Sequence, residues 1–363
     1  MSERVPFMSL VPGDDHGAIR AAIDRVLTRG WFILGPEVEA FEAEFAAAAG
    51  TSHAVGVGNG TDALALLLRA MGIGPGDEVV TSPTSAAFSA LAIQMAGATP
   101  VFADIDPDRF TLSPDAAASA ITTRTAAIMP VHLYGQPADM PAFAAIARRH
   151  NLALIEDACQ SHLATSAGKP VGTYGAGAGV SFYPTKNLGA LGDGGAAITN
   201  EAGLADKVKR LRNGGQSDKY RHVEFGVNSR LDDLQAAVLR ERLKRLPEWT
   251  ARRRALAAAY RRTISNPSVS VPRECDPGHV YHLFPVLVPN RDGFQAHLKS
   301  RGVGTLVHYP HSLTEQPAFA GAGGGPCPVA ERVAREVCSI PLHQNLSDSD
   351  LEFVAAAVNS RRA

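Results

Sequence analysis

Two short runs, Ala126-Ala-Ile-Met-Pro-Val131 and Leu152-Ala-Leu-Ile-Glu-Asp157, decide the fold class of this chain. Both are almost continuously apolar, which is typical of strands buried on both faces of a parallel sheet. Between them, Asp139 precedes Pro141 and a set of apolar residues at helical spacing, so this segment is predicted to be a capped, amphipathic helix. A strand, a helix and a second strand in this order indicate an α/β layer with a largely parallel sheet.

The same alternation extends over the first two-thirds of the chain and predicts seven strands. They are expected at Ala54–Gly58, Glu78–Ser82, Thr99–Asp104, Ala127–His132, Ala153–Asp157, Gly179–Tyr183 and Ala196–Thr199. In such sheets, ligands bind at the carboxyl ends of the strands.

From about Leu231 the pattern changes to a long helical stretch, in which Pro247 predicts a break or kink. A few strands follow, the clearest over Tyr281–Val288, and then a terminal helix near Asp348–Ser360. We therefore expect a large domain over residues 1–245 and a small C-terminal domain over residues 246–363. The glycines from Gly321 to Gly325 are interpreted as a flexible connection.

Composition excludes several classes of function. The formal net charge of the 363 residues is −1, which leaves no basic surplus for contacts with nucleic-acid phosphates. The arginines of one predicted helix are interpreted as a solvated face; they are Arg252, Arg253, Arg254, Arg261 and Arg262. No apolar run approaches the ~18 residues that span a bilayer, and no secretory signal opens the chain. Four scattered cysteines suit neither a disulfide framework nor a metal site, so a cytoplasmic location is expected.

The first chemical motif is Gly179-Val-Ser-Phe-Tyr-Pro-Thr-Lys-Asn-Leu-Gly189. Pro184 ends a predicted strand, and Lys186 follows in a loop of small residues. A lysine at the edge of a sheet can form an imine with a carbonyl group. Taken alone, however, Lys186 fits a surface turn better.

The second motif, Ile155-Glu-Asp-Ala-Cys-Gln-Ser-His162, places two carboxylates directly after a buried strand. Such a carboxylate either caps a helix or pairs with a protonated ring nitrogen, because a nearby negative charge favours the charged form of the ring. A strand that ends in a carboxylate, followed by a strand that ends near a lysine, is the order that a pyridoxal-5′-phosphate (PLP) site requires.

The third motif, Gly56-Val-Gly-Asn-Gly-Thr-Asp-Ala-Leu64, is a glycine-rich turn between a strand and a helix. Backbone N–H groups at such a helix start bind phosphate. The spacing does not match a dinucleotide fingerprint, and no lysine follows as in an ATP-binding loop, so a single phosphate fits better.

Together these blocks resemble the DegT/StrS-type sugar aminotransferases. The similarity extends from GWFILGPEVEAFEAEFA (30–46) through the three motifs and GVNSRLDDLQAAVLRERL (226–243) to VHYPHSLTEQPAF (307–319). It implies a PLP-dependent, aspartate-aminotransferase-like fold (fold type I). Such a fold has a large PLP-binding domain with a mostly parallel seven-stranded sheet and a small C-terminal α/β domain.

By this resemblance, Lys186 holds PLP as a Schiff base and later moves the proton. Asp157 binds the ring nitrogen, and Gln160 reaches the phenolic oxygen of the ring. Asn228 reaches the phosphate of the neighbouring subunit, so the site would lie at the interface of a homodimer. The phosphate of the same subunit would be held by Gly60, Thr61 and Ser181.

Four further residues are candidates for substrate binding. His162 and Arg230 either line the site or have structural roles, as a core histidine and a salt bridge respectively. His308 and Tyr309 lie in a loop that contacts substrate in similar proteins. Specificity for the sugar is expected in loops such as Gly30–Pro36, Gly214–Arg221 and Val307–Glu315.

Two positions depart from the family pattern. Where relatives carry an aromatic residue stacked on the PLP ring, the alignment places Ala86, with Phe88 two residues later. Cys159 stands where alanine is usual beneath the ring. Neither change removes the imine chemistry, but both leave the contacts to the ring faces open.

The resemblance implies transfer of an amino group, with L-glutamate as donor and a keto sugar nucleotide as acceptor. A sugar dehydratase is disfavoured, because related dehydratases carry histidine at the position of Lys186. Two alternatives stay open: an aminotransferase of a free cyclitol ketone, and a non-catalytic regulatory protein that binds PLP or a sugar.

Overall fold

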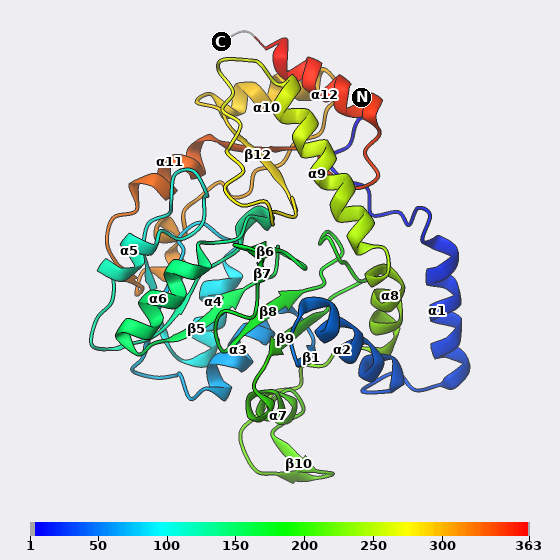
Figure 1. Cartoon of the computed structure of the whole chain (residues 1–363), viewed down its shortest axis with the longest axis vertical. Coiled ribbons are helices and arrows are strands. Elements are labelled where there is room, and N and C mark those ends of the chain that lie inside the picture. Colours follow the sequence, from blue (N-terminus) through cyan, green and yellow to red (C-terminus); the bar gives the residue numbers. More distant parts are fainter. Residues whose placement is uncertain (1–3, 362–363) are drawn as a thin grey trace.

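The central feature of the fold is a twisted sheet whose strands lie in the order β1–β9–β8–β5–β4–β2–β3–β13 (Figure 1). The computed structural model describes residues 4–361, and the ends of the two expected domains (1–3 and 362–363) lie outside them. The strands are β1 (His53–Val57), β2 (Glu78–Thr81), β3 (Thr99–Phe102), β4 (Thr125–Met129), β5 (Ala153–Asp157), β8 (Gly177–Ser181), β9 (Gly195–Thr199) and β13 (Gly323–Gly324). Only β9 runs antiparallel to its neighbours, β1 and β8, and the other pairs are parallel.

All seven predicted strands are confirmed; β5 has the predicted bounds, and the ends of the others are shifted. β4, for example, ends at Met129 rather than at His132. The next residue is Pro130, which has no N–H group to continue the ladder of hydrogen bonds.

The eighth strand corrects the prediction of a flexible glycine-rich connection. Gly323 and Gly324 pair in parallel with Val101 and Phe102 at the edge of the sheet. A Cβ at Gly324 would lie 2.1 Å from the carbonyl oxygen of Phe102, and its φ of +118° disfavours any other residue. Here glycine permits a close approach between two backbones rather than mobility.

Except for the outlying first helix, the helices of the N-terminal two-thirds pack around this sheet (Figure 1). They are α1 (His16–Arg29), α2 (Pro36–Ala49), α3 (Gly60–Ala70), α4 (Phe88–Ala96), α5 (Pro114–Ser119), α6 (Met140–His150) and α7 (Ala202–Leu211). The predicted cap of α6 is confirmed, because the Asp139 carboxylate accepts a hydrogen bond from the N–H of Ala142 at 3.3 Å. Two short hairpins, β6 (Thr165–Ser166) with β7 (Lys169–Pro170) and β10 (Gln216–Asp218) with β11 (Arg221–His222), complete this region.

The C-terminal part lies above the sheet in Figure 1 and has a hydrophobic cluster of its own. It contains α9 (Leu246–Thr263), α10 (Arg291–Ser300), α11 (Pro328–Glu336), α12 (Asp348–Asn359), β12 (Phe284–Leu287) and β14 (Val337–Ile340). The preceding helix, α8 (Asp233–Leu243), lies beside the sheet and packs against α1 and α2 (Figure 1). The predicted break at Pro247 is confirmed, since it stands in the first turn of α9 directly after the end of α8. Val5 packs in the same cluster as α9 and α12. The division at residues 245 and 246 stays a prediction.

Arg253 corrects the interpretation of the arginine cluster as a solvated face. Its side chain is 2% exposed, and Nη1 donates hydrogen bonds to the carbonyl oxygens of Tyr281, His282 and Leu342. One face of α9 packs against the C-terminal cluster, so helical spacing turns Arg253 inward. Within residues 4–361, no helix is long and apolar enough to cross a membrane.

Candidate active site

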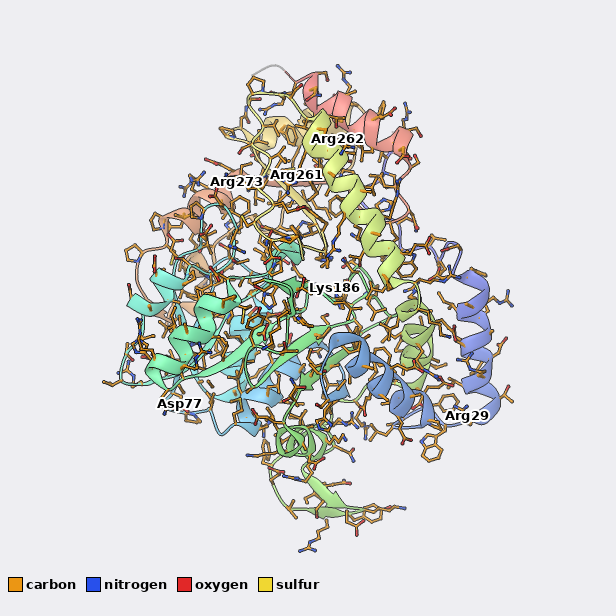
Figure 2. All side chains as sticks on the ribbon, in the orientation of Figure 1. Arg29, Asp77, Lys186, Arg261, Arg262 and Arg273 are labelled. Atoms are coloured by element: carbon orange, nitrogen blue, oxygen red, sulfur yellow. The ribbon has the colours of Figure 1, made fainter. Side chains whose placement is uncertain are left out.

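Lys186 lies near the middle of the molecule, between the sheet and the C-terminal part (Figure 2). β8 ends at Ser181, and the chain then turns so that the N–H of Lys186 donates to the carbonyl oxygen of Tyr183 at 2.8 Å. Burial lowers the pKa of the Lys186 amine, while the neighbouring Cys159 and Asp157 oppose this effect. A lysine with a lowered pKa is more readily the neutral nucleophile that imine formation needs.

The two carboxylates at the end of β5, Glu156 and Asp157, lie in different surroundings. Glu156 is fully buried and accepts hydrogen bonds from the N–H groups of Gly172 (2.8 Å) and Tyr174 (3.0 Å). Its Oε2 also lies 3.0 Å from His132 Nε2. Glu156 therefore holds the fold together and is not free to bind a ligand.

Asp157 is the carboxylate on the side of Lys186. One oxygen accepts from the N–H of Cys159 at 3.1 Å and the other from the hydroxyl of Ser89 at 2.5 Å. Because turns rather than a helix follow β5, Asp157 does not cap a helix. This removes the main structural alternative for its position.

The start of α3 forms a cradle that suits a phosphate group. Asn59 caps the helix by accepting from the N–H of Asp62 at 2.8 Å. Within the described part of the chain, no protein acceptor is recorded for the N–H groups of Gly60 and Thr61. Free N–H groups in the first turn of a helix are ready donors for an anion.

Gly60 also brings Ser181 and Cys159 to this cradle. A Cβ at Gly60 would lie 2.5 Å from Cys159 Sγ and 2.9 Å from Ser181 Cβ, so the three residues are in direct proximity. Burial raises the pKa of the Cys159 thiol well above its usual value, as does the nearby Asp157. Cys159 is therefore an inert packing residue rather than a nucleophile.

Gln160 is held from both ends of its amide. The N–H of Tyr134 donates to Oε1 at 2.8 Å, and Nε2 donates to the hydroxyl of Tyr309 at 3.0 Å. Burial raises the pKa of Tyr309 to about 12, so its hydroxyl stays protonated. His308 binds the hydroxyl of Ser339 through Nδ1 at 3.0 Å, and burial followed by the Lys186 charge lowers its pKa to about 4.

His162 lies next to Ser181, at the edge of the candidate active site. Its Nε2 is 2.7 Å from the carbonyl oxygen of Ser181, and since a carbonyl only accepts, Nε2 carries the proton. Nδ1 is buried and has no hydrogen-bond partner among the described residues. Burial lowers the pKa of His162 to about 3, so the ring is neutral.

Asn228 and Arg230 are not turned into the site of their own chain. Asn228 is exposed, and Arg230 Nη1 donates to Asn213 Oδ1 at 3.1 Å. Ser229, between them, accepts from the N–H of Gly58 at 2.9 Å and donates to Asp62 at 2.6 Å. The structure thus brings Lys186, Asp157, Gln160, Ser181 and the Gly60–Thr61 turn together, and leaves Asn228 facing outward.

Several residues of the site were missed by sequence reasoning. Ser89 binds Asp157, Tyr134 orients Gln160, and Asn187 Oδ1 lies 3.3 Å from the Nδ1 of buried His282. None carries a local signal, because each contact joins segments far apart in the chain. At the positions that depart from the family pattern, Ala86 is half-buried and Phe88 is 60% exposed.

A pocket of about 250 Å³ adjoins Lys186 and was also not foreseen. Its walls include Ser9–Asp15, Asn187, Trp249 and Asn345. The N-terminal segment 9–15 was not among the loops expected to contact substrate. The hairpin of β10 and β11, which carries the loop Gly214–Arg221, instead projects from the bottom of the molecule, away from Lys186 (Figures 1 and 2).

Residues 14–359 match the model of the DegT/DnrJ/EryC1/StrS aminotransferase family. The chain belongs to this family. Such a match spans both the sheet and the C-terminal part, and it confirms the resemblance seen in the three motifs. Members of the family are PLP-dependent aminotransferases, which agrees with the expected enzyme class, cofactor and fold.

Curated relatives support the same assignment. The chain is 48% identical over 349 residues to a dTDP-3-amino-3,4,6-trideoxy-alpha-D-glucose transaminase of Streptomyces venezuelae, covering 94% of this chain and 92% of that protein. It is 46% identical over 365 residues to the erythromycin biosynthesis sensory transduction protein EryC1 of Saccharopolyspora erythraea, covering 98% and 99%.

A solved structure shows that this similarity extends to the fold. The crystal structure of S. venezuelae DesV in complex with a ketimine intermediate superimposes with a TM-score of 0.96 at 46% identity, and all of both chains is covered. The expected α/β fold with a mostly parallel sheet is thereby confirmed.

Proposed function

We propose that this aminotransferase moves the amino group of L-glutamate to a keto sugar carried on a nucleotide, with Lys186 as the residue that holds PLP. The observation that carries the proposal is the meeting of three groups around Cys159. They are an amine of lowered pKa at Lys186, the carboxylate of Asp157 and the open N–H groups at Gly60 and Thr61. PLP has one counterpart for each: an aldehyde, a ring nitrogen and a phosphate.

When bound, PLP supplies an electron sink for the carbon that gains or loses the amino group. The residues of the chain do the rest. Lys186 would hold the aldehyde and, as a free neutral amine, would move the proton. Asp157 would keep the ring nitrogen protonated through its negative charge. Gly60, Thr61 and Ser181 would hold the phosphate.

The position of Gln160 fits its predicted contact with the phenolic oxygen of the ring. Because Tyr134 and Tyr309 fix both ends of the amide, its orientation does not depend on the cofactor. Neutral His162 and His308 add polar groups beside Lys186 without adding positive charge. Because these histidines are uncharged, they do not lower the pKa of Lys186 as nearby cations would, and burial is the main cause of its lowered pKa.

The active form is proposed to be a homodimer with its sites at the subunit interface. Asn228 is exposed, and the hairpin around Tyr220 projects from the body with Tyr220 82% and Phe225 84% exposed. Large exposed aromatic side chains in one region are typical of protein interfaces. A second subunit would cover them and bring Asn228 to the phosphate of the opposite site.

The proposed substrate class is taken from the names of the similar proteins. The transaminase of S. venezuelae named above acts on a dTDP-linked sugar, and the near-complete coverage of both chains extends this class to the present protein. The name of EryC1, a sensory transduction protein, keeps a regulatory role as the second candidate. Location in the cytoplasm stays a prediction.

The test is to follow the absorbance of the PLP-loaded protein as L-glutamate is added. We expect the yellow band of the lysine-bound cofactor to disappear and the band of pyridoxamine phosphate to grow. The matched variant Lys186→Ala should show no such exchange. Binding of PLP without any exchange, with all common amino donors, would favour the regulatory role, and absence of PLP binding would contradict the proposal.

The acceptor is tested in the second half-reaction. The pyridoxamine-phosphate form should return to the yellow form with a dTDP-linked 3-keto sugar, and much more slowly with a free cyclitol ketone. The reverse preference would identify a cyclitol aminotransferase.

A further inference from the structure

Two buried serines form a chain of hydrogen bonds that ends on Asp157. The hydroxyl oxygens of Ser85 and Ser89 are 3.0 Å apart, and Ser89 Oγ is 2.5 Å from Asp157 Oδ2. All three side chains are at most 4% exposed. Ser85 precedes α4 and Ser89 lies in its first turn, whereas Asp157 ends β5.

The chemistry of the groups fixes the direction of this chain. An ionised carboxylate has no proton to give, so the Ser89 hydroxyl donates to Asp157. The Ser89 oxygen is then left as an acceptor, and the Ser85 hydroxyl must donate to it. The two hydrogen bonds therefore point the same way, toward the carboxylate, and each polarises the next.

Asp157 thus receives two donors: the Ser89 hydroxyl on Oδ2 and the Cys159 N–H on Oδ1. Hydrogen bonds to a carboxylate favour its charged form, and a buried carboxylate without them is costly. The donor to Oδ2, Ser89, belongs to α4. The orientation of the Asp157 carboxylate therefore depends on a helix that carries none of the residues assigned to the cofactor.

We infer that Ser89, supported by Ser85, is a positioning residue for the ring nitrogen of the cofactor. It holds Asp157 as an oriented anion, so that the proton shared between carboxylate and ring stays on the ring nitrogen. The inference rests on the proposed role of Asp157 toward PLP. It adds a residue that none of the three sequence motifs contains.

A purely structural role is the competing explanation, because the same hydrogen bond also ties α4 to β5. The two roles differ in what they change. A tie affects only the stability of the fold, whereas a positioning residue changes the charge on the ring nitrogen. The chain offers a matched control in Ser166, which is 1% exposed and donates to the carbonyl oxygen of Ala138 at 3.1 Å.

The experiment compares Ser89→Ala, Ser89→Thr, Ser85→Ala and Ser166→Ala, each loaded with PLP that carries an isotopic label on the ring nitrogen. The magnetic-resonance signal of that nitrogen reports whether it is protonated. Affinity for PLP is measured on the apoprotein by fluorescence titration, and melting temperature reports the structural contribution.

We expect Ser89→Ala to move the ring-nitrogen signal toward that of an uncharged ring and to weaken PLP binding about tenfold, as for a lost hydrogen bond to a charged group. Ser85→Ala should shift the signal in the same direction by less. Ser89→Thr, which keeps the hydroxyl, should restore the signal, and Ser166→Ala should change only the melting temperature.

The inference is overturned if Ser89→Ala and Ser85→Ala lower the melting temperature as Ser166→Ala does and leave the signal and the PLP affinity unchanged. Should Ser89→Thr fail to fold, Ser85→Ala alone decides the question. If the unmodified protein bound no PLP, the proposed function would fail instead, which is a separate outcome.

Discussion

The side chains of Gln160 and Tyr309, 149 residues apart in the chain, are joined by a hydrogen bond of 3.0 Å from Nε2 to the phenolic hydroxyl. This contact connects the loop after β5 with the loop after α10 in the C-terminal part. It fixes the amide that is proposed to face the cofactor.

Tyr309→Phe should therefore weaken PLP binding by about 1 kcal/mol, the usual net value of one neutral hydrogen bond. The measurement is a double-mutant cycle with Gln160→Ala, read by fluorescence titration of the apoprotein. If the two residues act through their mutual contact, the double variant will bind PLP little worse than Gln160→Ala. Fully additive effects would show that Tyr309 acts independently of Gln160.

The two carboxylates at the end of β5 should give opposite results on substitution. Gly172 and Tyr174 donate to different oxygens of Glu156, so Glu156→Gln places its amide NH₂ against one of these two N–H groups, and we expect a loss of about 3 kcal/mol in the free energy of unfolding. Asp157→Asn should leave the fold stable and slow amino transfer by at least about a hundredfold, or ~2.7 kcal/mol in the activation barrier.

Urea unfolding and the glutamate half-reaction, measured on both variants, separate these two effects. A stable Glu156→Gln variant with impaired exchange would mean that the roles of the two carboxylates are reversed.

Gly60 should not tolerate alanine. The added methyl group would overlap with Cys159 Sγ and Ser181 Cβ, and the movement needed to relieve this would close the phosphate cradle. We expect Gly60→Ala to cost about 1–3 kcal/mol of stability and to weaken PLP binding. Gly203→Ala is the matched control, because nothing lies within 4 Å of its Cβ position in α7 and helix propensity favours alanine by up to about 1 kcal/mol.

Differential scanning calorimetry and PLP titration provide the two readouts. Equal behaviour of the two glycine variants would contradict the packing argument. Partial recovery of PLP binding in Gly60→Ala/Cys159→Ala would identify the Sγ overlap as part of the cause.

Stability should fall as the pH drops below the ordinary histidine pKa of 6.5. Burial lowers the pKa of His162 and His279 to about 3 and that of His308 and His343 to about 4. The unfolded chain therefore takes up protons at these sites before the folded chain does. Each site contributes stability above pH 6.5 and loses about 1.4 kcal/mol per pH unit between 6.5 and its folded value.

His343→Gln provides the sharpest check of this prediction, since neither nitrogen of His343 has a hydrogen-bond partner among the described residues. Urea unfolding at about pH 7 and about pH 5 should show a smaller difference for this variant than for the unmodified protein. An identical difference would show that His343 does not contribute to the acid sensitivity.

Local signals were sufficient for most of the sheet. Apolar runs and the alternation of β-rich with helical segments located all seven predicted strands, and the Asp139–Pro141 start located α6. The wrong predictions fall where the structure depends on contacts between segments that are far apart in the sequence. Gly323 and Gly324 form an edge strand only because β3 lies beside them, and Arg253 is buried only because α9 packs on the C-terminal cluster.

Some residues of the candidate site can also be found from local sequence signals, and others cannot. Lys186, Asp157 and the Gly60–Thr61 turn are recognisable in the sequence, because each stands at the end of a strand or the start of a helix within a short motif. Ser89, Tyr134 and the Ser9–Asp15 wall of the pocket carry no such signal. Their places follow from which strands and loops become neighbours in the folded chain.

The sequence by itself determined the family, the order of the strands along the chain and the three groups proposed to hold the cofactor, because strand patterns and turn chemistry act over a few residues. Only the tertiary structure decided which N–H groups Glu156 binds, which hydroxyl fixes Asp157, and which histidines are neutral. Those properties depend on burial and on hydrogen bonds between segments far apart in the chain, and these exist only once the sheet and the C-terminal part have packed together.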